Sequence, residues 1–83
     1  MAYNLVYKKS VIRDLESLPK KEVQRIRNQI IEVLLKNPYS FPALKGEFTG
    51  LRKFRVGKYR VIYTIVDNDV IIARIGHRKN VYR

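Results

Sequence analysis

The sequence predicts an α+β fold in which an N-terminal strand precedes an antiparallel helix hairpin that packs on one face of a mainly antiparallel β-sheet (β-α-α-β-β-β). Apolar residues in the first half of the chain recur every three or four positions, which is the period of an amphipathic helix. The second half instead contains three short runs of alternating side chains joined by turn residues, which is typical of strands. Eighty-three residues suit a single domain that covers residues 1–83.

The fold is expected to open with a short strand over residues 2–7 (AYNLVY). Ser10 can cap the first helix, because a serine hydroxyl can accept a hydrogen bond from a backbone N–H at a helix start. The apolar stripe of this helix is Val11, Ile12, Leu15 and Leu18. Pro19 stops the helix and also suits the first turn of the next one.

A second helix is expected to run to about Lys36. Its apolar face carries Val23, Ile26, Ile30 and Leu34, with Ile31 and Leu35 beside them. Because the connection between the two helices is so short, they should form an antiparallel hairpin. Residues 37–49 contain two prolines and a glycine and are predicted to form an irregular loop.

Three strands are expected at residues 50–56, 59–66 and 70–76. Gly57 can begin a two-residue turn, which would place Arg55 opposite Arg60. The next turn allows two registers. A three-residue Asp-Asn-Asp loop would place Arg60 near Gly76, whereas a two-residue loop would put His77 beside Arg60.

Alternation along these strands assigns side chains to two faces of the sheet. The face expected to pack on the helices collects Phe54, Val56, Tyr59, Val61, Tyr63, Ile65, Ile71, Ala73 and Ile75. The opposite face collects Leu51, Lys53, Arg55, Arg60, Ile62, Thr64, Ile72, Arg74 and Arg78. Four of these cations, at 53, 55, 60 and 78, are expected near the Gly57 turn, so the sequence predicts a concentrated cationic site.

The charge of the chain predicts a polyanionic partner. The formal net charge is +11, and residues 42–83 contain ten Lys or Arg against three acids. Nucleic acid fits best, and a membrane surface or an acidic protein is the alternative. No apolar run approaches the ~18–20 residues that span a bilayer, and the N-terminus lacks the apolar stretch of a signal peptide. The chain has no cysteine, and it is expected to be cytoplasmic.

Neither a metal ion nor a cofactor is expected. The only close carboxylates, Asp67 and Asp69, lie in a turn where Asp is ordinary. His77 is the single histidine, and zinc needs three or four ligands. RNA cleavage can proceed without these groups, because RNA supplies its own nucleophile, the 2′-hydroxyl. Arginine is suited to stabilise the extra negative charge at phosphorus, and the candidates for this role are Arg60 and Arg78.

Two further side chains could assist such a cleavage. Lys53 could add positive charge, or act as acid or base if neighbouring cations lower its pKa. Tyr82 is the best remaining proton-transfer group, because surrounding cations should lower the pKa of a phenol.

Four segments of the chain resemble a known family: LPK at 18–20, LKG at 44–46, GLRKFRVGKYRVIY at 50–63 and IGHRKNVY at 75–82. The sequence is similar to the RelE/ParE toxin superfamily, specifically to RelE-type mRNA interferases of prokaryotic toxin–antitoxin modules. The resemblance implies a RelE-like fold and cleavage of mRNA in the ribosomal A site. It also implies neutralisation by a cognate antitoxin that wraps the toxin through an acidic segment, in a higher-order hetero-oligomer.

Carried over by position, the catalytic residues of the family fall on Lys53, Arg60, Arg78 and Tyr82. The tyrosine would stack on a substrate base and assist proton transfer. Further residues expected to contact RNA are Arg55, Lys58, His77, Lys79, Arg83 and Lys45. Two alternatives stay open: a ParE-like toxin that poisons DNA gyrase without nuclease activity, and a basic nucleic-acid-binding module or inactive toxin.

Overall fold

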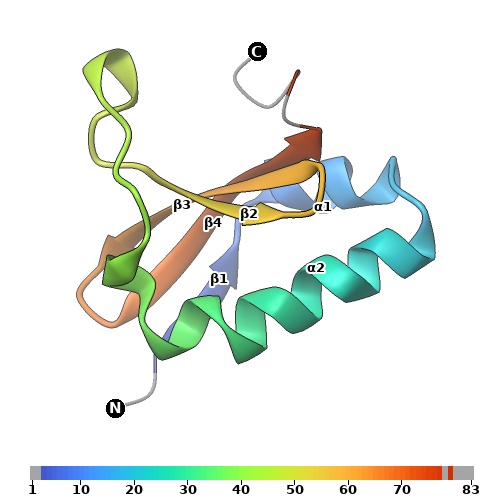
Figure 1. The fold of residues 1–83 in the computed structure, drawn as a ribbon, viewed down its shortest axis with the longest axis horizontal. Helices are drawn as coiled ribbons and strands as arrows, with labels where there is room; N and C mark the ends of the chain where they lie inside the picture. Colours follow the sequence, from blue (N-terminus) through green and yellow to red (C-terminus); the bar gives the residue numbers. More distant parts are fainter. Residues whose placement is uncertain (1–2, 78, 80–83) are drawn as a thin grey trace.

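The computed structural model describes residues 3–77 and 79, which form two helices and a four-stranded sheet (Figure 1). The elements in chain order are β1 (Asn4–Tyr7), α1 (Lys9–Glu16), α2 (Lys20–Glu32), β2 (Arg52–Val56), β3 (Tyr59–Val66) and β4 (Asp69–His77). Short 3₁₀ turns at Leu34–Lys36, Pro38–Ser40 and Gly46–Phe48 lie between α2 and β2. This order confirms the predicted α+β class.

The sheet has the strand order β1-β4-β3-β2. β1 pairs with β4 in parallel, and the other two pairings are antiparallel. Gly57 has a φ of +58°, a value that glycine adopts easily, and begins the predicted two-residue turn between β2 and β3. Arg55 therefore lies opposite Arg60, as predicted.

The turn between β3 and β4 differs from the three-residue loop that would give the Arg60–Gly76 register. Val66 pairs with Asp69, which leaves a two-residue turn in which Asp67 has a φ of +55°. A two-residue turn was expected to bring His77 beside Arg60. His77 instead pairs with Tyr59, because the register shifts once further along the strands.

That shift is a β-bulge at Ala73, which has no partner in the β3–β4 register. The extra residue restores the pairing of Arg60 with Gly76. It also changes which side chains of β4 face the helices, since one inserted residue reverses the alternation. The expected face assignment is therefore wrong before the bulge, where Ile72 is fully buried in the core and Ile71 lies on the opposite face.

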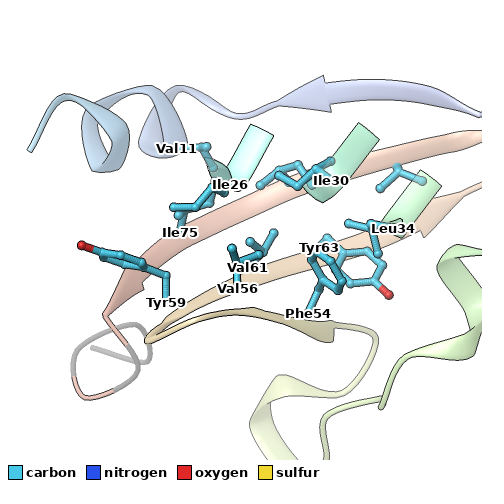
Figure 2. Packing of buried hydrophobic residues seen from close by; sticks show 12 residues of the cluster. Val11, Ile26, Ile30, Leu34, Phe54, Val56, Tyr59, Val61, Tyr63 and Ile75 are labelled. Atoms are coloured by element: carbon cyan, nitrogen blue, oxygen red, sulfur yellow. The ribbon is translucent and has the colours of Figure 1, made fainter. Parts of the chain in front are cut away.

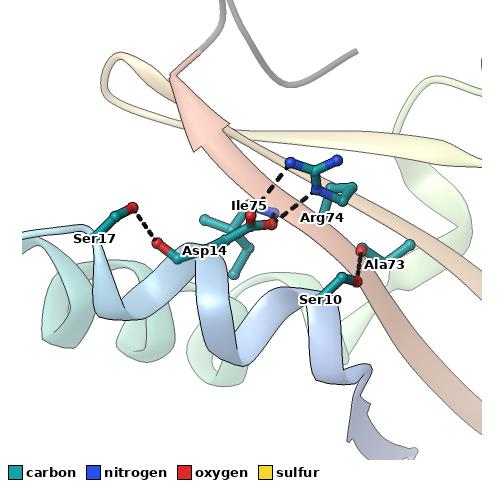
Figure 3. A network of polar contacts seen from close by, with 6 residues as sticks. All are labelled: Ser10, Asp14, Ser17, Ala73, Arg74 and Ile75. Atoms are coloured by element: carbon teal, nitrogen blue, oxygen red, sulfur yellow. Dashed lines mark hydrogen bonds and ion pairs between the residues drawn. The ribbon is translucent and has the colours of Figure 1, made fainter. Parts of the chain in front are cut away.

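α1 covers the edge of β4 beyond the end of β1 (Figure 3). The expected capping by Ser10 is wrong: Lys8 occupies the N-cap position, and the Ser10 hydroxyl donates to the Ala73 carbonyl at 3.0 Å. The Asp14 carboxylate accepts a hydrogen bond from the Ile75 N–H at 3.0 Å. These bonds satisfy edge groups that a neighbouring strand would otherwise pair.

α2 ends at Glu32, earlier than predicted, and continues as a 3₁₀ turn that buries Leu34. Its buried residues Ile26 and Ile30 face the sheet (Figure 2). The core comprises Val11, Ile26, Ile30, Leu34, Phe54, Val56, Tyr59, Val61, Tyr63, Val70, Ile72 and Ile75. Burial of one such aliphatic side chain is worth about 1.5–3 kcal/mol. No helix within residues 3–77 is long and apolar enough to cross a membrane.

Candidate functional site

The sheet face opposite the core gathers cations from β2 and β3. Arg55 and Arg60 are direct cross-strand partners, and Lys53 is two positions before Arg55 on β2. Cross-strand partners share a face, and so do residues two apart on one strand. Arg55 is exposed, whereas Lys53 and Arg60 are partly buried. The structure therefore brings three of the predicted site residues together.

Arg74 lies on the same face, but its guanidinium is bound to a carboxylate. Its Nε donates to Asp14 Oδ2 at 3.0 Å and its terminal nitrogen donates to Oδ1 at 3.2 Å (Figure 3). This two-point pairing is the strong geometry for arginine and carboxylate. We therefore assign Arg74 a structural role.

A hollow of about 310 Å³ lies beside this cationic face, at the outer edge of β2. Its lining residues are Phe41, Pro42, Lys53, Phe54, Arg55 and Arg60. The Lys53 N–H donates to the Pro42 carbonyl at 3.1 Å, which fixes the preceding loop against β2. Sequence reasoning missed Phe41 and Pro42, because only the folded loop brings them to the strand.

Arg52 also holds this loop. Its terminal nitrogen donates to the carbonyl of Phe41 at 2.6 Å and to that of Tyr39 at 3.2 Å. The guanidinium lies 5.4 Å from the centre of the Tyr39 ring, within the range of a cation–π contact. Arg52 pairs with Tyr63, so it lies on the other face from Lys53.

The remaining predicted contact residues are dispersed. Lys58 is exposed in the β2–β3 turn, close to Arg55 in sequence. Lys45 is exposed before the Gly46–Phe48 turn, which lies far from the β2–β3 turn (Figure 1). His77 pairs with Tyr59 on the helix-covered face, with ring centroids 6.3 Å apart. Its Nδ1 accepts a hydrogen bond from the Lys79 N–H at 3.3 Å.

Three predicted residues, Arg78, Tyr82 and Arg83, lie outside the residues that the structure describes. β4 ends at His77, opposite Tyr59. Their assignments stay predictions.

The larger hollow, of about 1000 Å³, lies away from the cations of the sheet. Its lining residues are Tyr7, Ile12, Leu15, Glu16, Leu18, Lys20, Val23, Gln24, Arg27, Asn28 and Ile31. Five of these eleven side chains are aliphatic, and burial raises the pKa of Tyr7 although the charge of Arg27 opposes this effect. We place the candidate site at the smaller hollow, because three cations and no carboxylate line it.

The described residues contain no group of three His, Cys, Asp or Glu side chains that could hold a metal ion. The smaller hollow instead offers guanidinium and ammonium donors. Such donors bind phosphate oxygens and stabilise negative charge that develops at phosphorus.

Comparisons with known proteins agree with this fold. The family described as "ParE toxin of type II toxin-antitoxin system, parDE" matches residues 5–82. The toxin RelE of Mycobacterium tuberculosis is 33% identical over 84 residues, which cover 98% of this chain and 87% of the relative.

Two solved structures are also similar. The toxin–antitoxin complex RelBE2 from Mycobacterium tuberculosis contains a chain that is 28% identical, with a TM-score of 0.87 and coverage of 94% of this chain and 100% of that one. The archaeal RelE–RelB complex from Pyrococcus horikoshii gives 31% identity, a TM-score of 0.71 and coverage of 98% and 100%. Fold, charge and matches together define a toxin of a type II toxin–antitoxin system. Within that class, the chain belongs to the RelE/ParE family.

Proposed function

We propose that this toxin is a ribosome-dependent endoribonuclease that cleaves mRNA in the A site and so inhibits translation in the cytoplasm. The observation that carries the proposal is the convergence of Lys53, Arg55 and Arg60 on one sheet face beside a hollow. A toxin that only poisons gyrase needs no phosphate-cleaving site.

In the proposed reaction, the 2′-hydroxyl of a nucleotide attacks the adjacent phosphorus and its proton is removed. The bond from phosphorus to the 5′-oxygen breaks, and that oxygen takes up a proton. The products are a 2′,3′-cyclic phosphate and a 5′-hydroxyl end. The reaction therefore needs groups that stabilise the phosphate charge and move two protons.

Arg60 and Arg78 are proposed to stabilise the charge on the phosphate oxygens, because a guanidinium stays protonated and matches these oxygens in shape. Lys53 adds positive charge and is a candidate for proton transfer. Tyr82 is proposed to stack on a base and to assist proton transfer.

A second candidate function follows from the family description, which names ParE. A ParE-like toxin would poison DNA gyrase without cutting RNA. Two assays on the same purified chain separate the functions. The first maps cleavage of a translated mRNA on ribosomes, and the second measures supercoiling by gyrase. The proposed function predicts cleavage within A-site codons and unimpaired supercoiling. Intact mRNA together with inhibited gyrase would show that the second function is correct.

We further propose that a cognate antitoxin neutralises the toxin by covering the cationic face with an acidic segment, within a higher-order hetero-oligomer. The solved RelBE2 and archaeal RelE–RelB relatives are toxin–antitoxin complexes. A chain with a net charge of +11 attracts an acidic partner over long range, chiefly through the association rate. The association rate should fall as salt rises, and a rate that is indifferent to salt would contradict charge-led recognition.

A further inference from the structure

We infer that the hollow beside β2 is a nucleotide subsite, in which Phe41 and Pro42 receive one RNA base while Arg55 and Arg60 hold its phosphate. The inference rests on the proposed function in one respect, namely that the nucleotide belongs to the mRNA. It adds a base-binding wall that the cationic residues do not supply.

The size of the hollow suits a single nucleotide. Its volume of about 310 Å³ is at the lower end of the ~300–1,000 Å³ typical of small-molecule sites. A helix or strand of a protein partner would need a longer groove. The occupant is therefore a small, compact group.

The hollow has an apolar part and a cationic part, and a nucleotide has a base and a phosphate that match them. Phe41, Pro42 and Phe54 are apolar residues, whereas Arg55 and Arg60 are cationic. Proteins bind unpaired bases on aromatic rings and bind the adjoining phosphates with basic side chains. An apolar ligand would not pair with the cations, and a free phosphate would not contact the Phe41 ring.

The apolar wall is held in place before any ligand binds. The rings of Phe41 and Phe54 meet edge to face, with centroids 4.9 Å apart and planes at 72°. The carbonyl of Phe41 accepts a hydrogen bond from Arg52, and the carbonyl of Pro42 accepts one from the Lys53 N–H. A preorganised wall lowers the entropy lost on binding.

The edge of β2 adds a backbone donor to the subsite. Lys53 directs its N–H outward to Pro42, so the alternation of the strand directs the Arg55 N–H to the same edge. Among residues 3–77 and 79, no hydrogen bond engages this N–H. It can donate to a phosphate oxygen or to an acceptor on the base.

The test is an NMR titration of the isotope-labelled full chain with adenosine 3′-monophosphate, and in parallel with ribose 5-phosphate, which lacks a base. We expect the nucleotide to shift the amide signals of Phe41, Lys53 and Arg55 and to bind more tightly than the sugar phosphate. Equal affinity for the two probes would overturn the inference, because the apolar wall would then contribute nothing. Shifts confined to the helix residues around the larger hollow would also overturn it.

Two matched variants test the wall itself. Phe41→Leu keeps an apolar side chain but removes the ring, and it should weaken nucleotide binding about tenfold, as loss of one stacking contact does. Val66→Ala shortens an exposed apolar side chain that lines neither hollow, and should leave binding unchanged. If Phe41→Leu fails to fold, Pro42→Ala takes its place. Equal affinity in the wall variant and in Val66→Ala would overturn the inference.

This titration uses no ribosomes, so it separates the inference from the proposed function. A chain that binds the nucleotide at Phe41 yet leaves mRNA intact supports the subsite and contradicts the nuclease. A chain that cleaves mRNA but does not bind the nucleotide at Phe41 supports the nuclease and overturns the subsite.

Discussion

Arg55 on β2 and Arg60 on β3 lie directly opposite each other, so two guanidinium groups occupy neighbouring positions on one face. Like charges at paired positions destabilise a sheet. Arg55 is tethered there by a hydrogen bond from its Nε to the Gly57 carbonyl at 3.3 Å. We attribute this pairing to a use in binding anions, since it does not favour folding.

Replacement of Arg55 by alanine should stabilise the fold. Arg55→Ala removes one of two opposed charges and should raise the free energy of unfolding by about 0.2–1 kcal/mol. Urea denaturation measures this change. Lys36→Ala removes an exposed cation that is not on the sheet and serves as the control, with an expected change within about 0.5 kcal/mol. A less stable Arg55→Ala protein would show that the hydrogen bond to the Gly57 carbonyl outweighs the repulsion.

Replacement of Gly57 by alanine should destabilise the fold for two reasons, a strained backbone conformation and a close contact with the Arg25 side chain. A φ of +58° costs an alanine about 1–2 kcal/mol. A Cβ at this position would also lie 3.1 Å from a terminal nitrogen of Arg25, which must then move. Gly46→Ala has a similar φ of +69° with open space around its Cβ, so it should carry the backbone cost alone.

The difference between these two variants isolates the Arg25 contact. Gly57→Ala should cost a few tenths of a kcal/mol more than Gly46→Ala, and Arg25→Ala should remove that excess. Urea denaturation of the single and double variants provides the measurement. If Gly57→Ala still costs more than Gly46→Ala in the absence of Arg25, the extra cost comes from the turn itself.

Asp14 should matter more to stability than its ion-pair partner does. Asp14→Ala removes both the acceptor for the Ile75 N–H and the pair with Arg74, and should cost about 1.5–3 kcal/mol. Arg74→Ala removes only the pair, in which the arginine side chain is 41% exposed, and should cost at most about 1 kcal/mol. Thermal unfolding compares the two variants. Equal losses would mean that the ion pair, and not the edge hydrogen bond, holds α1 on β4.

The Tyr63 hydroxyl should make stability depend on pH in the alkaline range. Burial raises the pKa of Tyr63 to about 12, although the charge of Arg52 opposes this effect, and the hydroxyl donates to the Pro38 carbonyl at 2.7 Å. Tyr63→Phe should lose about 1 kcal/mol at neutral pH, because that carbonyl loses its donor.

The direction of the pH effect follows from the pKa of Tyr63 in the folded and unfolded states. The folded pKa lies above the unfolded value near 10, so the contribution of Tyr63 is complete below pH 10 and is lost as pH rises toward 12. The difference in unfolding free energy between wild type and Tyr63→Phe should therefore shrink above pH 10. A difference that stays constant from pH 7 to 11.5 would contradict the raised pKa.

The sequence predicts local features of this fold better than long-range ones. The turn at Gly57 depends on a positive φ that glycine signals directly, so the pairing of Arg55 with Arg60 could be predicted. The bulge at Ala73 lies where β1 ends and α1 takes over the edge of β4. The Ser10 hydroxyl, 63 residues away in sequence, bonds to this bulged residue, and no local pattern announces such a contact.

In the candidate site, too, the sequence predicts the positions of the strand residues but not those of the loop residues. Alternation along β2 and β3 placed Lys53, Arg55 and Arg60 on one face, which the structure bears out. Phe41 reaches the same place through an irregular loop held by Arg52, and loop conformations have no sequence period from which to predict them.

The rate of mRNA cleavage on programmed ribosomes tests the central claim most directly. Single-turnover rates would be compared for wild type, Arg60→Ala and Arg74→Ala, which remove arginines from the same face. Loss of Arg60 should slow cleavage about 10²–10³-fold, the usual effect of losing one donor to a developing anion. Loss of Arg74, which is bound to Asp14, should change the rate only a few-fold. Equal rates in wild type and a folded Arg60→Ala protein would contradict the account.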